Sequence, residues 1–226
     1  MAADLVVVPS EVFARTAADY IARAVRATAH DGRLIFVALS GGKSPRPVYQ
    51  DLARNDTVPW DLVELFFADE RAVPVDDHRS NFRLVREALG SRFEGRIESI
   101  HRMEADRPDL VQAAEEYEAL MPARFDLVVL GMGEDGHTAS LFPGHPATGE
   151  QRRRVLAITG PVSPGRITIT PPVIREAGTV LMLVAGEAKA AAVASALRGP
   201  FDPVQCPAQL AQPGTWILDE PAASLL

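Results

Sequence analysis

The chain has 226 residues, of which 47% are hydrophobic, enough for one domain with an ample core. Its formal net charge of −7 argues against non-specific binding to nucleic acid. The single cysteine, Cys206, leaves no internal disulfide, and the N-terminus lacks a signal-peptide pattern, so we expect a reduced, cytoplasmic setting. No apolar run is long enough to predict a membrane span.

Short apolar runs alternate with amphipathic helical patterns along the chain. In chain order we expect a strand at 5–8, a helix at 11–29, a strand at 33–39, a helix at 45–54, a strand at 62–67, and helices at 81–89 and 108–120. There follow strands at 126–131, 155–160, 166–170 and 179–186, a helix at 187–198 and a short strand at 216–218. This alternation predicts a single Rossmann-like α/β domain over residues 1–226, with a mostly parallel sheet and helices on both faces.

Three polar loops follow predicted strands, at 40–46, 68–82 and 131–146. In open α/β sheets, ligands bind beyond the carboxyl ends of the strands. We therefore expect the functional residues in these three loops. Two further segments rich in Pro and Gly, 142–149 and 199–214, are also predicted to be loops.

The third loop begins with Gly131, Gly133 and Gly136, the G-x-G-x-x-G spacing of a dinucleotide-binding turn. That turn needs a helix at its end to bind a pyrophosphate, but Pro143 interrupts the pattern soon afterwards. Acidic side chains inside the loop would also repel a pyrophosphate. We interpret these glycines instead as residues that let a tight loop bring polar side chains close to a ligand.

His137 is the strongest catalytic candidate, because the ordinary pKa of a histidine side chain suits a general base near neutral pH. Asp135 lies two residues before it and could orient the imidazole. The alternative is a loop histidine that only caps a backbone carbonyl.

Ser40, Gly41, Gly42 and Lys43 follow a buried strand and precede a predicted helix. Glycines there allow close backbone approach, and free N–H groups at a helix start favour a phosphate. The alternative is an ordinary strand–turn–helix connection.

Charged residues supply the remaining candidates. Asp69 and Arg71 end another predicted strand, where they could be catalytic or could form a solvated loop with internal pairing. Arg166 begins a strand, and Lys189 lies in the first turn of a helix, where it opposes the helix dipole unless it faces an anion. Solvated surface positions are the alternative for both.

The sequence contains no zinc-protease, paired C-x-x-C or G-x-S-x-G motif. We therefore expect no metal and no cofactor, and direct attack by water as the hydrolytic mechanism. His30 and His101 lie in polar surroundings and are expected at the surface.

Together the motifs resemble a known family. "LSGGKSP" (39–45), "FADERAVPVDDHRSNF" (67–82) and "LGMGEDGHTASLFPGHP" (130–146) resemble the 6-phosphogluconolactonase branch of the glucosamine-6-phosphate isomerase/6-phosphogluconolactonase family. "GRITIT" (165–170) and "VAGEAKAAAV" (184–193) are similar to its later motifs. The isomerase branch typically has Tyr at the position of Arg71 and Glu at that of Phe142. These two departures favour the lactonase.

The resemblance implies hydrolysis of 6-phospho-D-glucono-1,5-lactone to 6-phospho-D-gluconate in the oxidative pentose phosphate pathway. His137, Asp135, Arg71 and Asp69 would be catalytic. The substrate and its phosphate would be bound by Ser40, Gly41, Gly42, Lys43, Arg166 and Lys189. The alternatives are aldose–ketose chemistry of the glucosamine-6-phosphate deaminase/isomerase type and a non-catalytic sugar-phosphate sensor. The expected partner is a phosphorylated sugar lactone, with no nucleic acid and no membrane, and the protein is expected to be a monomer or a weak homo-oligomer.

Overall fold

A six-stranded parallel sheet forms the centre of the structure, a computed structural model that describes residues 3–29, 32–160 and 162–226. The strand order is β1-β9-β8-β5-β2-β3, and every neighbouring pair is parallel. The strands are β1 (Asp4–Val8), β2 (Ile35–Leu39), β3 (Val63–Phe67), β5 (Leu127–Gly131), β8 (Thr179–Val184) and β9 (Thr215–Asp219). The predicted mostly parallel α/β architecture is confirmed.

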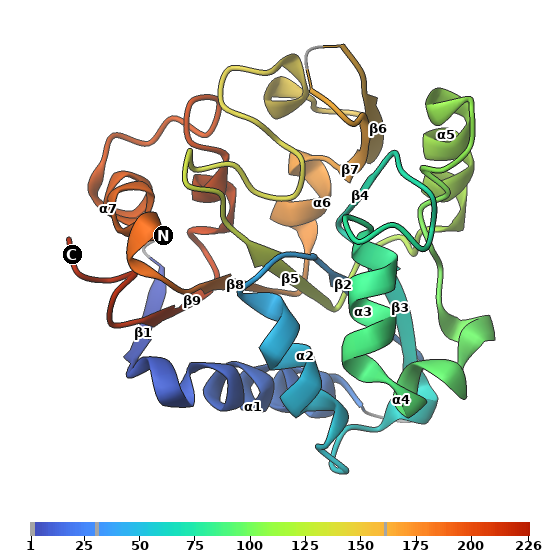
Figure 1. The fold of residues 1–226 in the computed structure, drawn as a ribbon, viewed down its shortest axis with the longest axis horizontal. Coiled ribbons are helices and arrows are strands. Elements are labelled where there is room, and N and C mark those ends of the chain that lie inside the picture. Colours follow the sequence, from blue (N-terminus) through green and yellow to red (C-terminus); the bar gives the residue numbers. More distant parts are fainter. Residues whose placement is uncertain (1–2, 30–31, 161) are drawn as a thin grey trace.

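Helices lie on both sides of this sheet. The helices on one side are α1 (Ser10–Thr28), α2 (Pro45–Ala53) and α3 (Asn81–Leu89); those on the other side are α5 (Leu110–Leu120), α6 (Pro171–Glu176) and α7 (Ala190–Arg198) (Figure 1). The continuous apolar runs of the central strands follow from this double cover, because both faces of a strand such as β5 are then buried.

A second, antiparallel sheet of three strands lies beside the first (Figure 1). Its order is β4 (Asp69–Arg71), β7 (Arg166–Ile169) and β6 (Val155–Ile158). We expected a polar loop at 68–82, before the helix at 81–89, and this was wrong for Asp69–Arg71, which form β4. Three consecutive charged residues carry no strand pattern, so only the pairing with β7 reveals the strand. The pairing also places Arg71 directly opposite Arg166.

Short elements and boundaries differ from the prediction in smaller ways. The helices α4 (Ser91–Glu94) and α6 were not predicted, and β9 is longer than the expected 216–218 and lies inside the sheet between β1 and β8. Short 3-10 helices occupy Trp60–Leu62, Ile97–Ser99, Pro146–Gly149, Glu187–Lys189 and Pro207–Ala211.

The histidines expected at the surface have different outcomes. The His101 imidazole is only partly exposed, since it stacks on Phe66 with ring centroids 4.3 Å apart, and its Nε2 lies 2.6 Å from Glu64 Oε2. His30 lies outside the described residues.

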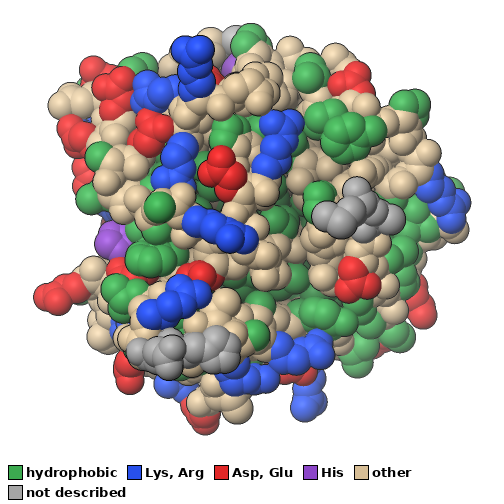
Figure 2. Space-filling view, turned by 180° about the vertical axis from the view of Figure 1, so that it is seen from behind, with side chains coloured by type: hydrophobic (Ala, Val, Ile, Leu, Met, Phe, Trp, Pro, Cys, Tyr) green, Lys and Arg blue, Asp and Glu red, His purple; other side chains and the backbone are tan. Residues whose placement is uncertain are grey.

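The surface charge is locally mixed although the chain is acidic. On the face seen from behind, Lys and Arg side chains gather near the centre and the lower edge, close to Asp and Glu side chains (Figure 2). Positive charge is therefore not confined to any one site. None of the helices within 3–29, 32–160 and 162–226 combines the length and the apolar character needed to cross a bilayer.

Candidate active site

The three predicted loops meet at the carboxyl ends of β2, β3 and β5, where they surround a cleft of about 410 Å³. The cleft is lined by most of the predicted site residues: Ser40, Gly41, Gly42, Lys43, Asp69, Arg71, His137 and Lys189. Asp135 and Arg166 do not line it. A larger cleft, of about 510 Å³, opens near the amino ends of the strands beside Arg33 and Thr179, and it contains none of the predicted residues.

The first wall of the cleft is the turn that joins β2 to α2. Gly42 has a φ of +111°, a conformation that favours glycine. Gly41 is in close contact with Asn81, because a Cβ at Gly41 would lie 1.8 Å from Asn81 Oδ1. The two glycines therefore serve the backbone conformation and the close packing of this turn.

The second wall contains His137. The structure shows what two glycines of the G-x-G-x-x-G spacing do in this loop. A Cβ at Gly133 would lie 2.1 Å from His137 Nδ1 and 2.4 Å from Asp135 Oδ1. Gly136 has a φ of +83°. Gly133 thus leaves space for the His137–Asp135 pair, and Gly136 allows the backbone to turn. Both glycines are explained without a bound dinucleotide.

His137 and Asp135 form a close pair. Asp135 Oδ1 lies 2.6 Å from His137 Nδ1 and also accepts the backbone N–H of His137 at 3.1 Å. Burial raises the pKa of Asp135, but the contacts with His137 lower it by a larger amount. The net shift of the pKa is downward, so the carboxylate is charged near neutral pH. A charged acceptor at Nδ1 assigns the ring proton to Nδ1, which leaves Nε2 of the neutral imidazole free to accept a proton.

Phe142 packs against the same imidazole. The two ring centroids are 4.9 Å apart and tilted by 44°. An apolar ring at this position excludes water from one side of His137 but has no proton to exchange.

The third wall contains Asp69, a residue that is only 5% exposed and whose carboxylate accepts hydrogen bonds on both oxygens. Ser140 Oγ donates to Asp69 Oδ2 at 2.7 Å, and Asn81 Nδ2 donates to Asp69 Oδ1 at 2.9 Å. The Ser140 backbone N–H donates in turn to Thr168 Oγ1 at 3.0 Å. Asp69 thus links β4, α3, the His137 loop and β7.

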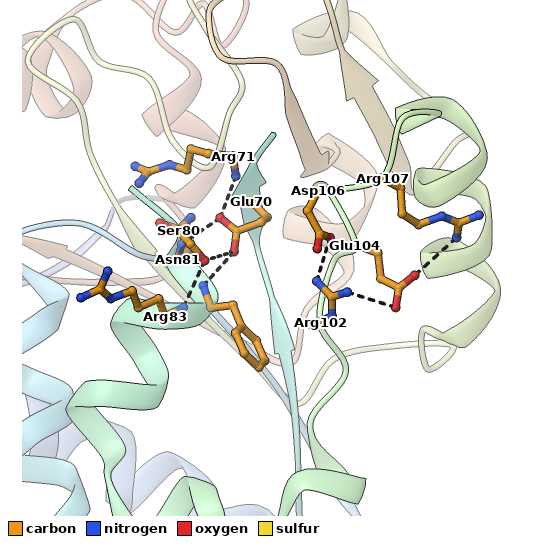
Figure 3. A network of polar contacts seen from close by, with 10 residues as sticks. Glu70, Arg71, Ser80, Asn81, Arg83, Arg102, Glu104, Asp106 and Arg107 are labelled. Atoms are coloured by element: carbon orange, nitrogen blue, oxygen red, sulfur yellow. Dashed lines mark hydrogen bonds and ion pairs between the residues drawn. The ribbon is translucent and has the colours of Figure 1, made fainter. Parts of the chain in front are cut away.

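Glu70, next to Asp69, caps the start of α3. Its carboxylate accepts the backbone N–H groups of Arg71, Asn81 and Phe82 at 2.7–2.8 Å and the Ser80 hydroxyl at 3.0 Å (Figure 3). A buried carboxylate with this set of donors fixes the position of β4 relative to α3.

Sequence reasoning missed the buried polar residues Asn81, Ser140 and Glu70 as parts of this site. Each stands inside a quoted motif, but a polar residue in a loop is ordinarily exposed. Their burial follows from contacts between segments far apart in the chain, which the local pattern does not contain.

Two arginines, Arg71 and Arg166, lie opposite each other where β4 pairs with β7. Arg71 lines the cleft, while Arg166 donates to the backbone carbonyls of Pro164 and, at 3.2 Å, Gly165. Burial and the adjacent positive charge of Arg71 lower the pKa of Arg166. Two cations held this close repel each other, so an anion between them would be favourable.

Lys189 approaches the cleft from the end of the 3-10 helix Glu187–Lys189, one residue before α7. Its Nζ lies 3.8 Å from Glu134 Oε1, a carboxylate of the His137 loop that also lines the cleft. Glu134 was not predicted as a site residue. Within 3–29, 32–160 and 162–226, no three His, Cys, Asp or Glu side chains come together as possible metal ligands.

The fold and the site define an α/β enzyme with its cleft at the carboxyl ends of parallel strands. A histidine that pairs with a carboxylate lines one wall of that cleft, and positive side chains also line it. The chain belongs to the glucosamine-6-phosphate isomerases/6-phosphogluconolactonase family, whose model matches residues 9–218.

Relatives within this family are similar over most of their length. The 6-phosphogluconolactonase of Synechocystis sp. is 38% identical over 206 residues, which are 84% of each chain. That of Mycobacterium tuberculosis is 37% identical over 218 residues, 88% of each chain. The crystal structure of the 6-phosphogluconolactonase of Thermotoga maritima matches with a TM-score of 0.83 and 29% identity, over 96% of this chain and 99% of that one.

Proposed function

We propose that this protein hydrolyses 6-phospho-D-glucono-1,5-lactone to 6-phospho-D-gluconate, a step of the oxidative pentose phosphate pathway, in the cytoplasm. The observation that carries the proposal is the His137–Asp135 pair on the wall of a cleft that is also lined by cations, in a chain whose relatives are 6-phosphogluconolactonases. The contact of Phe142 with the imidazole supports this reaction over ring-opening isomerisation, because a phenyl ring cannot relay a proton.

The substrate phosphate binds at one end of the cleft. The Gly41–Gly42 backbone, Lys189 and Arg166 hold the dianion, with Arg166 leaving its backbone carbonyls to reach it. Fixing this distant group places the lactone carbonyl beside His137, which removes much of the entropic cost of the reaction.

His137 Nε2 takes a proton from a water molecule, and the water oxygen bonds to C1 of the lactone. Asp135 orients the imidazole and stabilises its charged form. Arg71 stabilises the negative charge on the former carbonyl oxygen, and Asp69 helps to hold the substrate. The C1–ring oxygen bond then breaks as His137 returns its proton to the departing ring oxygen, which gives the open-chain acid.

The test is an activity assay on the purified protein with two substrates. We expect lactone hydrolysis above the rate without protein, and no release of ammonia from glucosamine 6-phosphate. His137→Ala should lower the turnover of the lactone about 10²–10⁴-fold, the usual contribution of a general base.

His101→Ala is the matched control, since His101 also lies 2.6 Å from a carboxylate, that of Glu64, but lies outside the cleft. We expect this variant to keep wild-type turnover. Near-normal turnover by His137→Ala would refute the general-base role, and ammonia release without lactone turnover would favour the isomerase-type reaction instead.

A further inference from the structure

Two fully buried side chains lie beneath the turn that joins β2 to α2. Tyr49, in α2, and Asn81, the first residue of α3, are each 0% exposed. The Tyr49 hydroxyl donates to the carbonyl oxygen of Ser40 at 2.7 Å, and the Asn81 side chain fills the space beside Gly41. The turn is therefore supported from the core side by one residue of α2 and one residue of α3.

The bond from Tyr49 fixes the orientation of the peptide that joins Ser40 to Gly41. In a trans peptide the C=O and N–H groups point in opposite directions. The Ser40 carbonyl points to the buried Tyr49 hydroxyl, so the Gly41 N–H points away from that hydroxyl, and Gly41 itself lines the cleft. No backbone carbonyl within 3–29, 32–160 and 162–226 accepts this N–H.

The hydroxyl of Tyr49 is suited to a permanent donor role. Burial, followed by the nearby charge of Asp69, raises the pKa of Tyr49, so the phenol keeps its proton through the physiological pH range. The Ser40 carbonyl would lose this partner if the hydroxyl were removed, and the peptide would be free to rotate.

We propose that Tyr49 is a positioning residue that orients the Ser40–Gly41 peptide so that the Gly41 N–H binds the phosphate of the substrate. This inference rests on the proposed function, since it assigns one phosphate ligand in the same cleft. Tyr49 itself does not line the cleft, so its loss should weaken phosphate binding more than it slows the chemical step.

The test is Tyr49→Phe, which keeps the ring and removes only the hydroxyl. We expect KM for the phosphorylated lactone to rise about 3–10-fold, the effect of one lost hydrogen bond, with kcat within about twofold of the wild type. The inhibition constant of inorganic phosphate should rise by the same factor. A simple loss of core stability would not produce this division between KM and kcat.

Tyr117→Phe is the matched control. Tyr117 is also buried, and its hydroxyl also bonds to backbone, donating to the Phe67 carbonyl at 3.1 Å and accepting the Phe67 N–H at 2.8 Å. Phe67 is the last residue of β3 and does not belong to the turn that joins β2 to α2. The inhibition constant of inorganic phosphate should therefore stay at its wild-type value in this variant. An equal rise in both variants would overturn the assignment to Tyr49.

A second measurement on the wild-type protein applies if Tyr49→Phe fails to fold. Addition of inorganic phosphate should shift the amide proton resonance of Gly41, and an unmoved resonance at saturating phosphate would overturn the inference. A wild type that does not hydrolyse the lactone would refute the proposed function. An active wild type whose Tyr49→Phe variant keeps KM and phosphate inhibition unchanged would refute only the role of Tyr49.

Discussion

At the scale of single residues, the site depends on positions where a side chain must be absent. The imidazole of His137 and the carboxylate of Asp135 occupy the space that any larger residue at position 133 would need. Gly133 is therefore as necessary to the pair as the two residues that form it, although it has no chemistry of its own.

Gly133→Ala tests this requirement. The added methyl group should push the imidazole away from its position, and we expect turnover of the lactone to fall about 10²-fold, as a displacement of about 1 Å can cause. Gly149→Ala is the control, since a Cβ there meets nothing within 4 Å, and it should keep wild-type turnover. Equal activity of the two variants, measured as kcat, would contradict the steric account.

At the scale of elements, the short strand β4 and the helix α3 are joined by buried carboxylates. Glu70 receives the first backbone N–H groups of α3, which have no partner inside the helix. Asp69 receives the side chain of Asn81 from the same helix start. The start of α3 thus holds the proposed catalytic residues of β4 in a fixed position relative to the turn that joins β2 to α2.

Glu70→Gln should weaken this connection, because an amide nitrogen would face N–H donors that the carboxylate now satisfies (Figure 3). We expect the free energy of unfolding to fall by about 1–3 kcal/mol, measured by urea denaturation. Glu87, in α3, forms surface ion pairs with Arg83 of the same helix and with Arg46 of α2. Glu87→Gln removes both pairs and should lower the free energy of unfolding by less than about 1 kcal/mol. A cost for Glu70→Gln no larger than that of Glu87→Gln would contradict the capping role.

At the scale of the whole molecule, the cations that line the cleft come from distant parts of an acidic chain. Arg71 belongs to the second sheet, and Lys189 lies near the start of α7. Pairing of β1 with β9 joins the two ends of the chain within one sheet. A ligand that contacts several of these elements is therefore bound only by the folded state and must stabilise the whole fold.

The product 6-phospho-D-gluconate should raise the melting temperature for this reason. At about 100 times its Kd, the ligand adds about 2.7 kcal/mol to the stability. For a domain of this size that corresponds to about 5–11 °C, measurable by thermal denaturation. Gluconate at the same concentration should have little effect, and Lys189→Ala should reduce the shift given by the phosphorylated compound. An equal shift with gluconate would contradict a phosphate-dominated site.

Much of the fold was predictable because it depends on local pattern. Buried parallel strands are continuous apolar runs, and β2, β5 and β8 were all predicted within a few residues of their bounds. The strand β4 was not, because Asp69, Glu70 and Arg71 have the composition of a loop and become a strand only by pairing with β7.

The sequence by itself determined the parallel α/β class and singled out the three segments that meet at the cleft, the one with His137 among them, since apolar runs and glycine spacing are properties of neighbouring residues. Only the tertiary structure decided which polar groups are buried. Asn81 and Ser140 bind Asp69, and Tyr49 binds the Ser40 carbonyl, through contacts between separate elements. A hydrogen bond across the core depends on the distance between packed elements. The spacing of residues along the chain does not determine that distance.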